Sequence, residues 1–99
     1  MRDISSLTKE EINEFLNVVI GIDKYSLLNI KHDEDGDGKS VIIEFKRVND
    51  DDDDWYDTFE MYQNELHVFY LTGEIDNIDL IYQDFLWSKG FKERRFIIK

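Results

Sequence analysis

The sequence predicts an α+β fold: an antiparallel sheet of four to five strands with two helices, in the order α-β-β-β-β-α-β. Two segments carry apolar residues at helical spacing, and four segments between them alternate apolar and polar residues as strands do. Short connections between these strand segments favour an antiparallel meander. With 99 residues, 41% of them apolar, the chain is expected to form a single acidic α+β domain over residues 1–99.

The first helix is predicted to begin after Thr8, because Thr8 and Glu11 have the spacing of a capping box. Leu7, just before the cap, is placed to pack against the helix as a hydrophobic staple. Gly21 ends the helix at the position that favours a left-handed residue. The apolar stripe of this helix comprises Ile12, Phe15, Leu16, Val19 and Ile20.

The strands are expected at residues 25–32, 41–48, 55–62 and 65–71. In the first of them, Leu28 and Ile30 share one face. In the second, Ile43 and Phe45 alternate with charged residues. The third and fourth segments are joined through residues 63–64, a Gln-Asn pair that suits a hairpin turn.

The second helix is predicted to begin after Gly73, to run to about Lys89 and to be ended by Gly90. Leu80 and Trp87 lie on the side opposite its apolar stripe. That stripe comprises Ile75, Ile78, Ile81, Tyr82, Phe85 and Leu86. Residues 93–98 are expected to form a last strand, which lies beside either the fourth strand or the first.

The net charge is −11, from 23 acidic and 12 basic residues. Such a negatively charged surface disfavours direct binding to nucleic acid or to an anionic membrane. Its charge is suited to binding basic proteins or cations, or to keeping the protein soluble. The chain has no cysteine, which excludes disulfides and thiolate metal sites. Residues 1–4 lead into a helix without an apolar signal region, so a cytoplasmic location is expected.

Four acidic residues, Asp33, Asp35, Asp37 and Glu44, have with Gly38 the spacing of a calcium-binding EF-hand loop. The segment resembles that loop over twelve residues. Ser40 stands where the family has an aliphatic residue, and the flanking segments read as strands. The alternative is an acidic Asp-Gly hairpin loop between two strands. No other cofactor is indicated.

The candidate partner-binding residues form two groups. One group joins a run of acidic residues to two aromatic ones and comprises Asp50, Asp51, Asp52, Asp53, Asp54, Trp55 and Tyr56. The acidity around this run is expected to extend to Asp33, Glu34, Asp35, Asp37, Asp57 and Glu60. The second group lies on the second helix and comprises Leu80, Asp84 and Trp87. Carboxylates steer a basic partner, and aromatic anchors supply desolvated contact.

The sequence offers little for catalysis, so the protein is not expected to be an enzyme. Its two histidines, His32 and His67, lie in predicted strands away from any nucleophile motif. Neither a glycine-rich phosphate loop nor an HExxH or GxSxG motif is present.

The favoured hypothesis is a small acidic protein that inhibits a basic nucleic-acid-binding enzyme by protein–protein contact. In size and acidity the chain is similar to immunity proteins that neutralise nuclease toxins. It is equally similar to phage anti-CRISPR and anti-restriction proteins that mimic DNA. This similarity implies a basic partner, such as a nuclease, and no direct contact with nucleic acid or membrane. Two alternatives stay open: a calcium-binding module, and a structural or assembly component whose charge provides solubility.

Overall fold

The computed structural model describes residues 1–48, 56–69 and 75–93. Its elements are a 3-10 helix η1 (Ile4–Ser6), helix α1 (Lys9–Val19), strands β1 (Tyr25–Asp35), β2 (Gly38–Arg47), β3 (Asp57–Tyr62) and β4 (Leu66–Phe69), and helix α2 (Ile78–Ser88). The predicted α+β class is confirmed, as is the order of two helices around four strands. The predicted last strand, residues 93–98, lies outside the described part of the chain except for Glu93.

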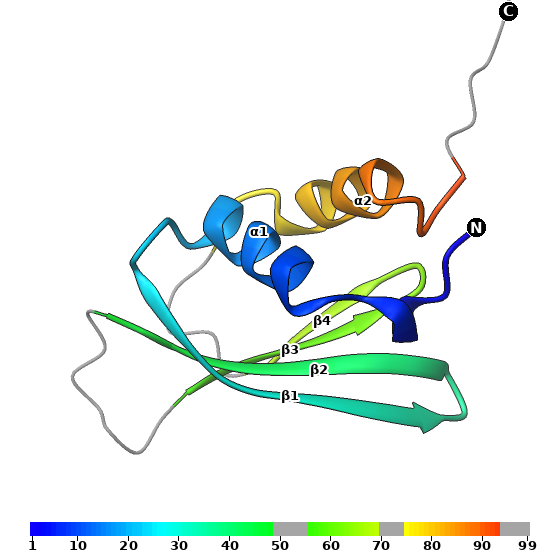
Figure 1. Cartoon of the computed structure of the whole chain (residues 1–99), viewed down its shortest axis with the longest axis horizontal. Coiled ribbons are helices and arrows are strands. Elements are labelled where there is room, and N and C mark those ends of the chain that lie inside the picture. The colour runs from blue at the N-terminus through cyan, green and yellow to red at the C-terminus, as the bar shows by residue number, and fades with distance from the viewer. Residues whose placement is uncertain (49–55, 70–74, 94–99) are drawn as a thin grey trace, which may run out of the picture.

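The four strands form one antiparallel sheet in the order β1-β2-β3-β4. Both α-helices lie over the same face of this sheet (Figure 1). Between the helices and the sheet lies the core, whose largest fully buried side chains include Phe15, Phe45, Phe59 and Tyr82. No described helix covers the other face, which is called the open face below (Figure 1).

Helix α1 begins where the sequence predicts. The backbone N–H of Glu11 donates to the Thr8 hydroxyl at 3.2 Å, and the Glu11 carboxylate accepts from the Thr8 N–H at 3.1 Å, which completes the capping box. Ile12, Phe15 and Leu16 of the predicted stripe are fully buried. The cap therefore determines where the helix begins, and the apolar stripe determines which side of it packs against the sheet.

Aromatic rings connect the helices to the sheet. The Phe15 ring lies edge-on to Phe59 and Tyr82, with centroid distances of 6.1 Å and 5.5 Å. Phe45 and Phe59 make a further edge-on pair at 4.9 Å. The buried Tyr82 hydroxyl donates to the carbonyl oxygen of Tyr62 at 2.6 Å, so the one polar atom of this side chain is satisfied.

Strand β1 departs from the prediction at a β-bulge. The register with β2 shifts between Leu27, which pairs with Phe45, and Asn29, which pairs with Glu44. The extra residue, Leu28, is left 54% exposed, whereas Leu27 and Ile30 pack against the core. The prediction that Leu28 and Ile30 share a face was wrong, because a bulge breaks the simple alternation of side chains.

Helix α2 begins later than predicted. Asn77 has φ 58 and ψ 27, which is a left-handed conformation. A left-handed residue cannot be part of a right-handed α-helix, so the helix cannot extend back through Asn77. The helix therefore starts at Ile78 and not soon after Gly73. Its predicted buried face is correct, since Tyr82, Phe85 and Leu86 are buried. In the described part of the chain, no helix has the length and apolar character needed to cross a membrane.

Candidate partner-binding surface

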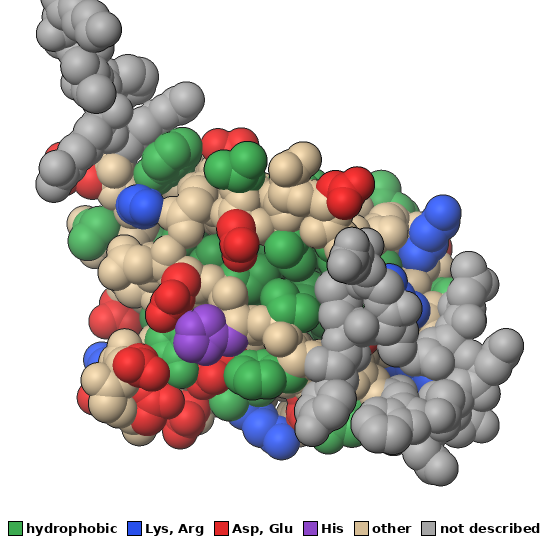
Figure 2. Space-filling model, turned by 180° about the vertical axis from the view of Figure 1, so that it is seen from behind, with side chains coloured by type: hydrophobic (Ala, Val, Ile, Leu, Met, Phe, Trp, Pro, Cys, Tyr) green, Lys and Arg blue, Asp and Glu red, His purple; other side chains and the backbone are tan. Residues whose placement is uncertain are grey.

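The β1–β2 hairpin projects a group of carboxylates. Asp33, Glu34, Asp35 and Asp37 are all exposed at or next to its turn, and Glu60 of β3 adjoins them. These five residues are called the acidic end below. The space-filling view shows acidic side chains gathered at this end of the sheet (Figure 2). Because the hairpin brings them together, residues of two strands and a turn form one negatively charged surface.

The local sequence explains the tight turn at the acidic end. Asp35 pairs with Gly38, so Gly36 and Asp37 form a two-residue connection. The N–H of Asp37 donates to the Asp35 carboxylate at 2.8 Å, which is the hydrogen bond of an Asx turn. Gly38 has φ 107, a value that residues with side chains rarely adopt. The prediction of an Asp-Gly hairpin here is confirmed.

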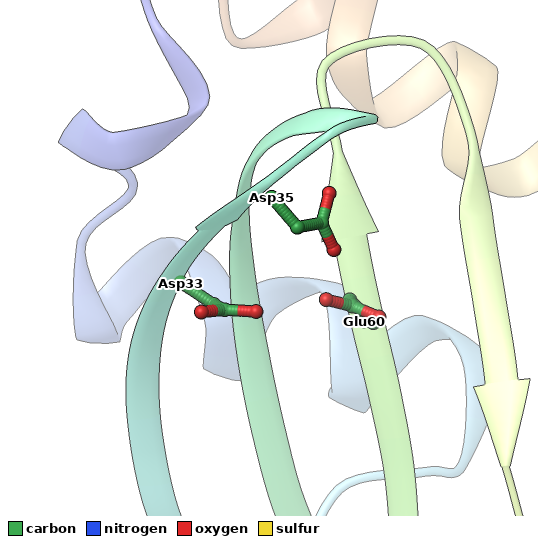
Figure 3. Close-up of side chains that lie close together, drawn as sticks. All are labelled: Asp33, Asp35 and Glu60. Atoms are coloured by element: carbon green, nitrogen blue, oxygen red, sulfur yellow. The ribbon is translucent and has the colours of Figure 1, made fainter.

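Three carboxylates of the acidic end converge on the open face. Carboxylate oxygens of Asp33, Asp35 and Glu60 all lie within 4.8 Å of one another (Figure 3). Asp33 and Asp35 are two residues apart on β1, so both point to the same face. Glu60 reaches them from β3 beside Ser40 of β2, which pairs with Asp33 on one side and with Tyr62 on the other. These three residues are called the carboxylate trio.

Hydroxyl groups hold two members of the trio in place. Ser40 donates to Glu60 at 2.7 Å, and Tyr62 donates to Asp35 at 3.2 Å. Burial raises the pKa of Tyr62 above its ordinary value, and the nearby carboxylates of Glu60 and Asp35 raise it further. The phenol therefore stays protonated and remains a donor to Asp35. The trio offers negatively charged oxygen atoms to a cation or to basic side chains.

The residues of the EF-hand pattern do not come together as a loop. Asp33 and Asp35 belong to the trio, but Asp37 lies in the turn and Glu44 lies on β2 opposite Asn29. Lys31 approaches Glu44 at 3.1 Å. The segment forms paired strands, whereas the EF-hand loop joins two helices. Calcium binding by residues 33–44 stays a prediction.

Few described basic side chains offset the acidic end. Lys39 lies at its base, where its ammonium group is 3.7 Å from the carboxylate of Asp3. Lys31 pairs with Glu44, further along the sheet. Because both lysines already have an acidic neighbour, the carboxylates of the trio keep their excess negative charge. Such an excess attracts a basic partner over several ångströms.

Aromatic side chains adjoin the trio on the open face. The Tyr62 and His67 rings are 4.8 Å apart, and His67 and Phe69 are 6.4 Å apart. His67 pairs with Glu60 across the β3–β4 ladder, which places this row beside the trio. Phe69 and Tyr56 are each 43% exposed. The open face thus combines carboxylates with accessible aromatic surface, as interface anchors require.

One predicted member of the acidic surface is buried. Asp57 has no exposed surface, and its carboxylate oxygen lies 3.4 Å from Nε of Arg47. The prediction that Asp57 extends the acidic surface was therefore wrong. It pairs with Phe45 in the β2–β3 ladder, and Phe45 faces the core. Burial of a carboxylate requires a compensating cation, which Arg47 provides.

Four of the other predicted partner-binding residues lie in the described part of the chain. Leu80 and Asp84 are exposed on α2, while Trp87 is half-buried beneath Lys92, whose ammonium lies 5.7 Å from the ring centroid. Tyr56 lies just before β3. The first six members of the acidic group lie outside the described residues: Asp50, Asp51, Asp52, Asp53, Asp54 and Trp55.

Comparisons with protein-family models, with curated proteins and with solved structures find no match to this chain.

Proposed function

We propose that the protein is a small acidic binding protein that inhibits a basic nucleic-acid-binding enzyme by protein–protein contact. The observation that carries this proposal is the carboxylate trio, three acidic groups within 4.8 Å of one another on an uncovered sheet face. Such a cluster repels itself in the free protein, and a basic partner relieves that repulsion on binding. The partner therefore gains binding energy from charges that destabilise the unbound state.

The charge of this surface suits a cleft that binds nucleic acid. Duplex DNA carries one negative charge per about 1.7 Å of its axis, and its binding proteins place lysine and arginine against the phosphates. The acidic end offers Asp33, Asp35 and Glu60 on the open face and Glu34 and Asp37 at the hairpin turn. Such carboxylates bind the lysine and arginine side chains that would otherwise contact the phosphates, and the protein thereby excludes the nucleic acid.

Aromatic residues supply the contact that charge alone does not. Tyr56 and Phe69 are accessible beyond the trio on the sheet. Aromatic anchors at the centre of an interface slow dissociation, whereas peripheral charge speeds association. Immunity to a nuclease toxin and phage counter-defence against a host nuclease both fit this proposal. We place this contact in the cytoplasm, the location expected from the sequence.

The test compares two variants that lose the same charge. The hairpin variant carries Asp33→Asn, Glu34→Gln and Asp35→Asn. The control variant carries Glu10→Gln, Asp76→Asn and Asp79→Asn, which are exposed on or beside the helices. A nucleic-acid-binding enzyme is captured from cell extract on the immobilised protein and purified, and association is measured at two salt concentrations. The hairpin variant should associate about tenfold more slowly at low salt, with a weaker salt dependence.

Competition with DNA completes the test. The unaltered protein should be displaced from the enzyme by duplex DNA, because both need the same basic side chains. Equal losses in the two variants would show that only net charge matters, and the acidic end would not be the binding surface. A complex that forms with protein and DNA bound together would refute inhibition by occupation of the cleft.

A further inference from the structure

A groove lies between α1 and α2. It has a volume of about 400 Å³. Its apolar lining comes from Phe15 and Val18 of α1 and from Ile81 and Phe85 of α2. Val18 is 69% exposed, and nearby on α2 Leu80 is 67% exposed. A protein with a net charge of −11 thus presents accessible aliphatic surface on its helical layer.

Acidic side chains border this groove. Glu14 of α1 and Asp84 of α2 both line it and both are exposed. Lys89 is the basic residue among those that line the groove, and its ammonium group contacts the Glu14 carboxylate. Asp84 forms no ion pair with any described residue. The border of the groove therefore keeps a negative charge beside its apolar floor.

We propose that this groove binds an amphipathic helix of a partner protein, with apolar side chains on one face and lysine or arginine beside them. The α2 residues that line the groove span positions 81–88, about 10 Å at 1.5 Å per residue, which matches two turns of a bound helix. Apolar side chains of the partner pack on the exposed Val18 and on the partly buried Ile81. Its basic groups reach Asp84.

Charge decides between the possible occupants. A second copy of this chain also carries −11, so a pair of copies would repel across the groove. An anionic lipid surface meets the same repulsion. A basic helix is attracted and also covers the apolar floor. The proposal stands apart from the proposed function, because the groove lies on the helical layer and the acidic end lies on the hairpin and open face.

The probe is a synthetic helical peptide of leucine and lysine with leucine at positions i, i+3, i+4 and i+7. Two control peptides are a scrambled sequence of the same composition and a leucine–glutamate version of the same pattern. Binding to the full chain is followed by fluorescence anisotropy and by NMR shift changes of the ¹⁵N-labelled protein. The amphipathic basic peptide should bind most tightly, with its largest shifts at Val18, Ile81, Asp84 and Ser88.

Matched variants separate the groove from general acidity. Val18→Asn and Asp84→Lys should each weaken binding, together by about tenfold or more, as expected for loss of interface anchors. Asp33→Lys makes the same charge change at the acidic end and should alter affinity by no more than about twofold, as for a remote surface charge. Val18 and Asp84 are exposed, so both variants should keep the fold, which circular dichroism checks.

Four results would overturn the proposal. Shift changes confined to the acidic end would place the peptide elsewhere, and equal binding of the scrambled peptide would leave only net charge as the cause. A concentration-dependent dimer in sedimentation equilibrium that Val18→Asn abolishes would assign the groove to a second copy. Binding to anionic vesicles that the same variant abolishes would assign it to lipid.

Discussion

Arg2 joins three parts of the chain that are distant in sequence. Its guanidinium donates to both oxygens of the Glu11 carboxylate, at 2.6 and 2.8 Å, and to the carbonyl oxygen of Lys89 at 3.1 Å. The same group lies 4.2 Å from the centroid of the Phe91 ring. The sequence indicates Glu11 only as part of a capping box, because nothing local to Arg2 reveals contacts 9 and 87 residues away.

Glu11 should make the stability of the fold depend on pH in the acidic range. Its hydrogen bonds from Arg2, then from Thr8, lower its pKa to about 2 from an ordinary value of 4.5. A carboxyl group whose pKa is lower in the folded state stabilises the fold above its unfolded pKa, and that stabilisation is lost as the pH falls. Urea unfolding should therefore show a contribution from Glu11 that is complete above about pH 5 and declines towards pH 2.

The variant Glu11→Gln isolates this contribution. The difference in unfolding free energy between the unaltered protein and Glu11→Gln should be largest near neutral pH and shrink between pH 5 and about pH 2. The neighbouring Glu10→Gln, which is exposed, is the control and should give a difference that stays small at every pH. A Glu11→Gln difference that does not change with pH would mean that Arg2 does not hold the carboxylate in solution.

At the scale of helices and strands, the sequence predicts those features that depend on the local pattern of residues. The capping box of α1 and the alternation that buries Ile43 and Phe45 are both local, and both are confirmed. The β1 bulge at Leu28 and the late start of α2 do not depend on local pattern, and the sequence does not predict them. A bulge arises from the pairing of two strands, and the left-handed Asn77 arises from how the chain must turn into α2.

Asn77 provides a test of this turn. Its side chain makes no capping hydrogen bond, so a substitution reports mainly on the left-handed backbone. Asn77→Ala should lower the free energy of unfolding by about 1 kcal/mol, because alanine disfavours this conformation. Asn77→Gly should stay within about 0.5 kcal/mol of the unaltered protein, because glycine adopts positive φ readily but gains freedom when unfolded. Equal losses for both variants in urea titrations would show that α2 does not need the left-handed residue.

At the scale of the whole molecule, the sequence establishes the charge but not where it gathers. The sequence itself shows the acidic residues of the hairpin, and their exposure follows from their position at or next to a turn. Their approach to Glu60 depends on the register that puts Ser40 between β1 and β3. The burial of Asp57 depends likewise on pairing with Phe45. The α1–α2 groove depends on helix packing, which residue spacing within either helix does not specify.

The net charge of −11 should make the stability of the fold rise with salt. Like charges crowded on the folded surface separate on unfolding, and salt screens their repulsion with a Debye length of about 30 Å at 0.01 M and 10 Å at 0.1 M. The thermal midpoint should therefore increase between these concentrations of sodium chloride. The hairpin variant, which lacks three charges of the acidic end, should have a higher midpoint at low salt and a smaller increase, because the repulsion within the trio is already reduced. A midpoint that falls with salt would mean that attraction in pairs such as Arg2–Glu11 outweighs the repulsion at the acidic end.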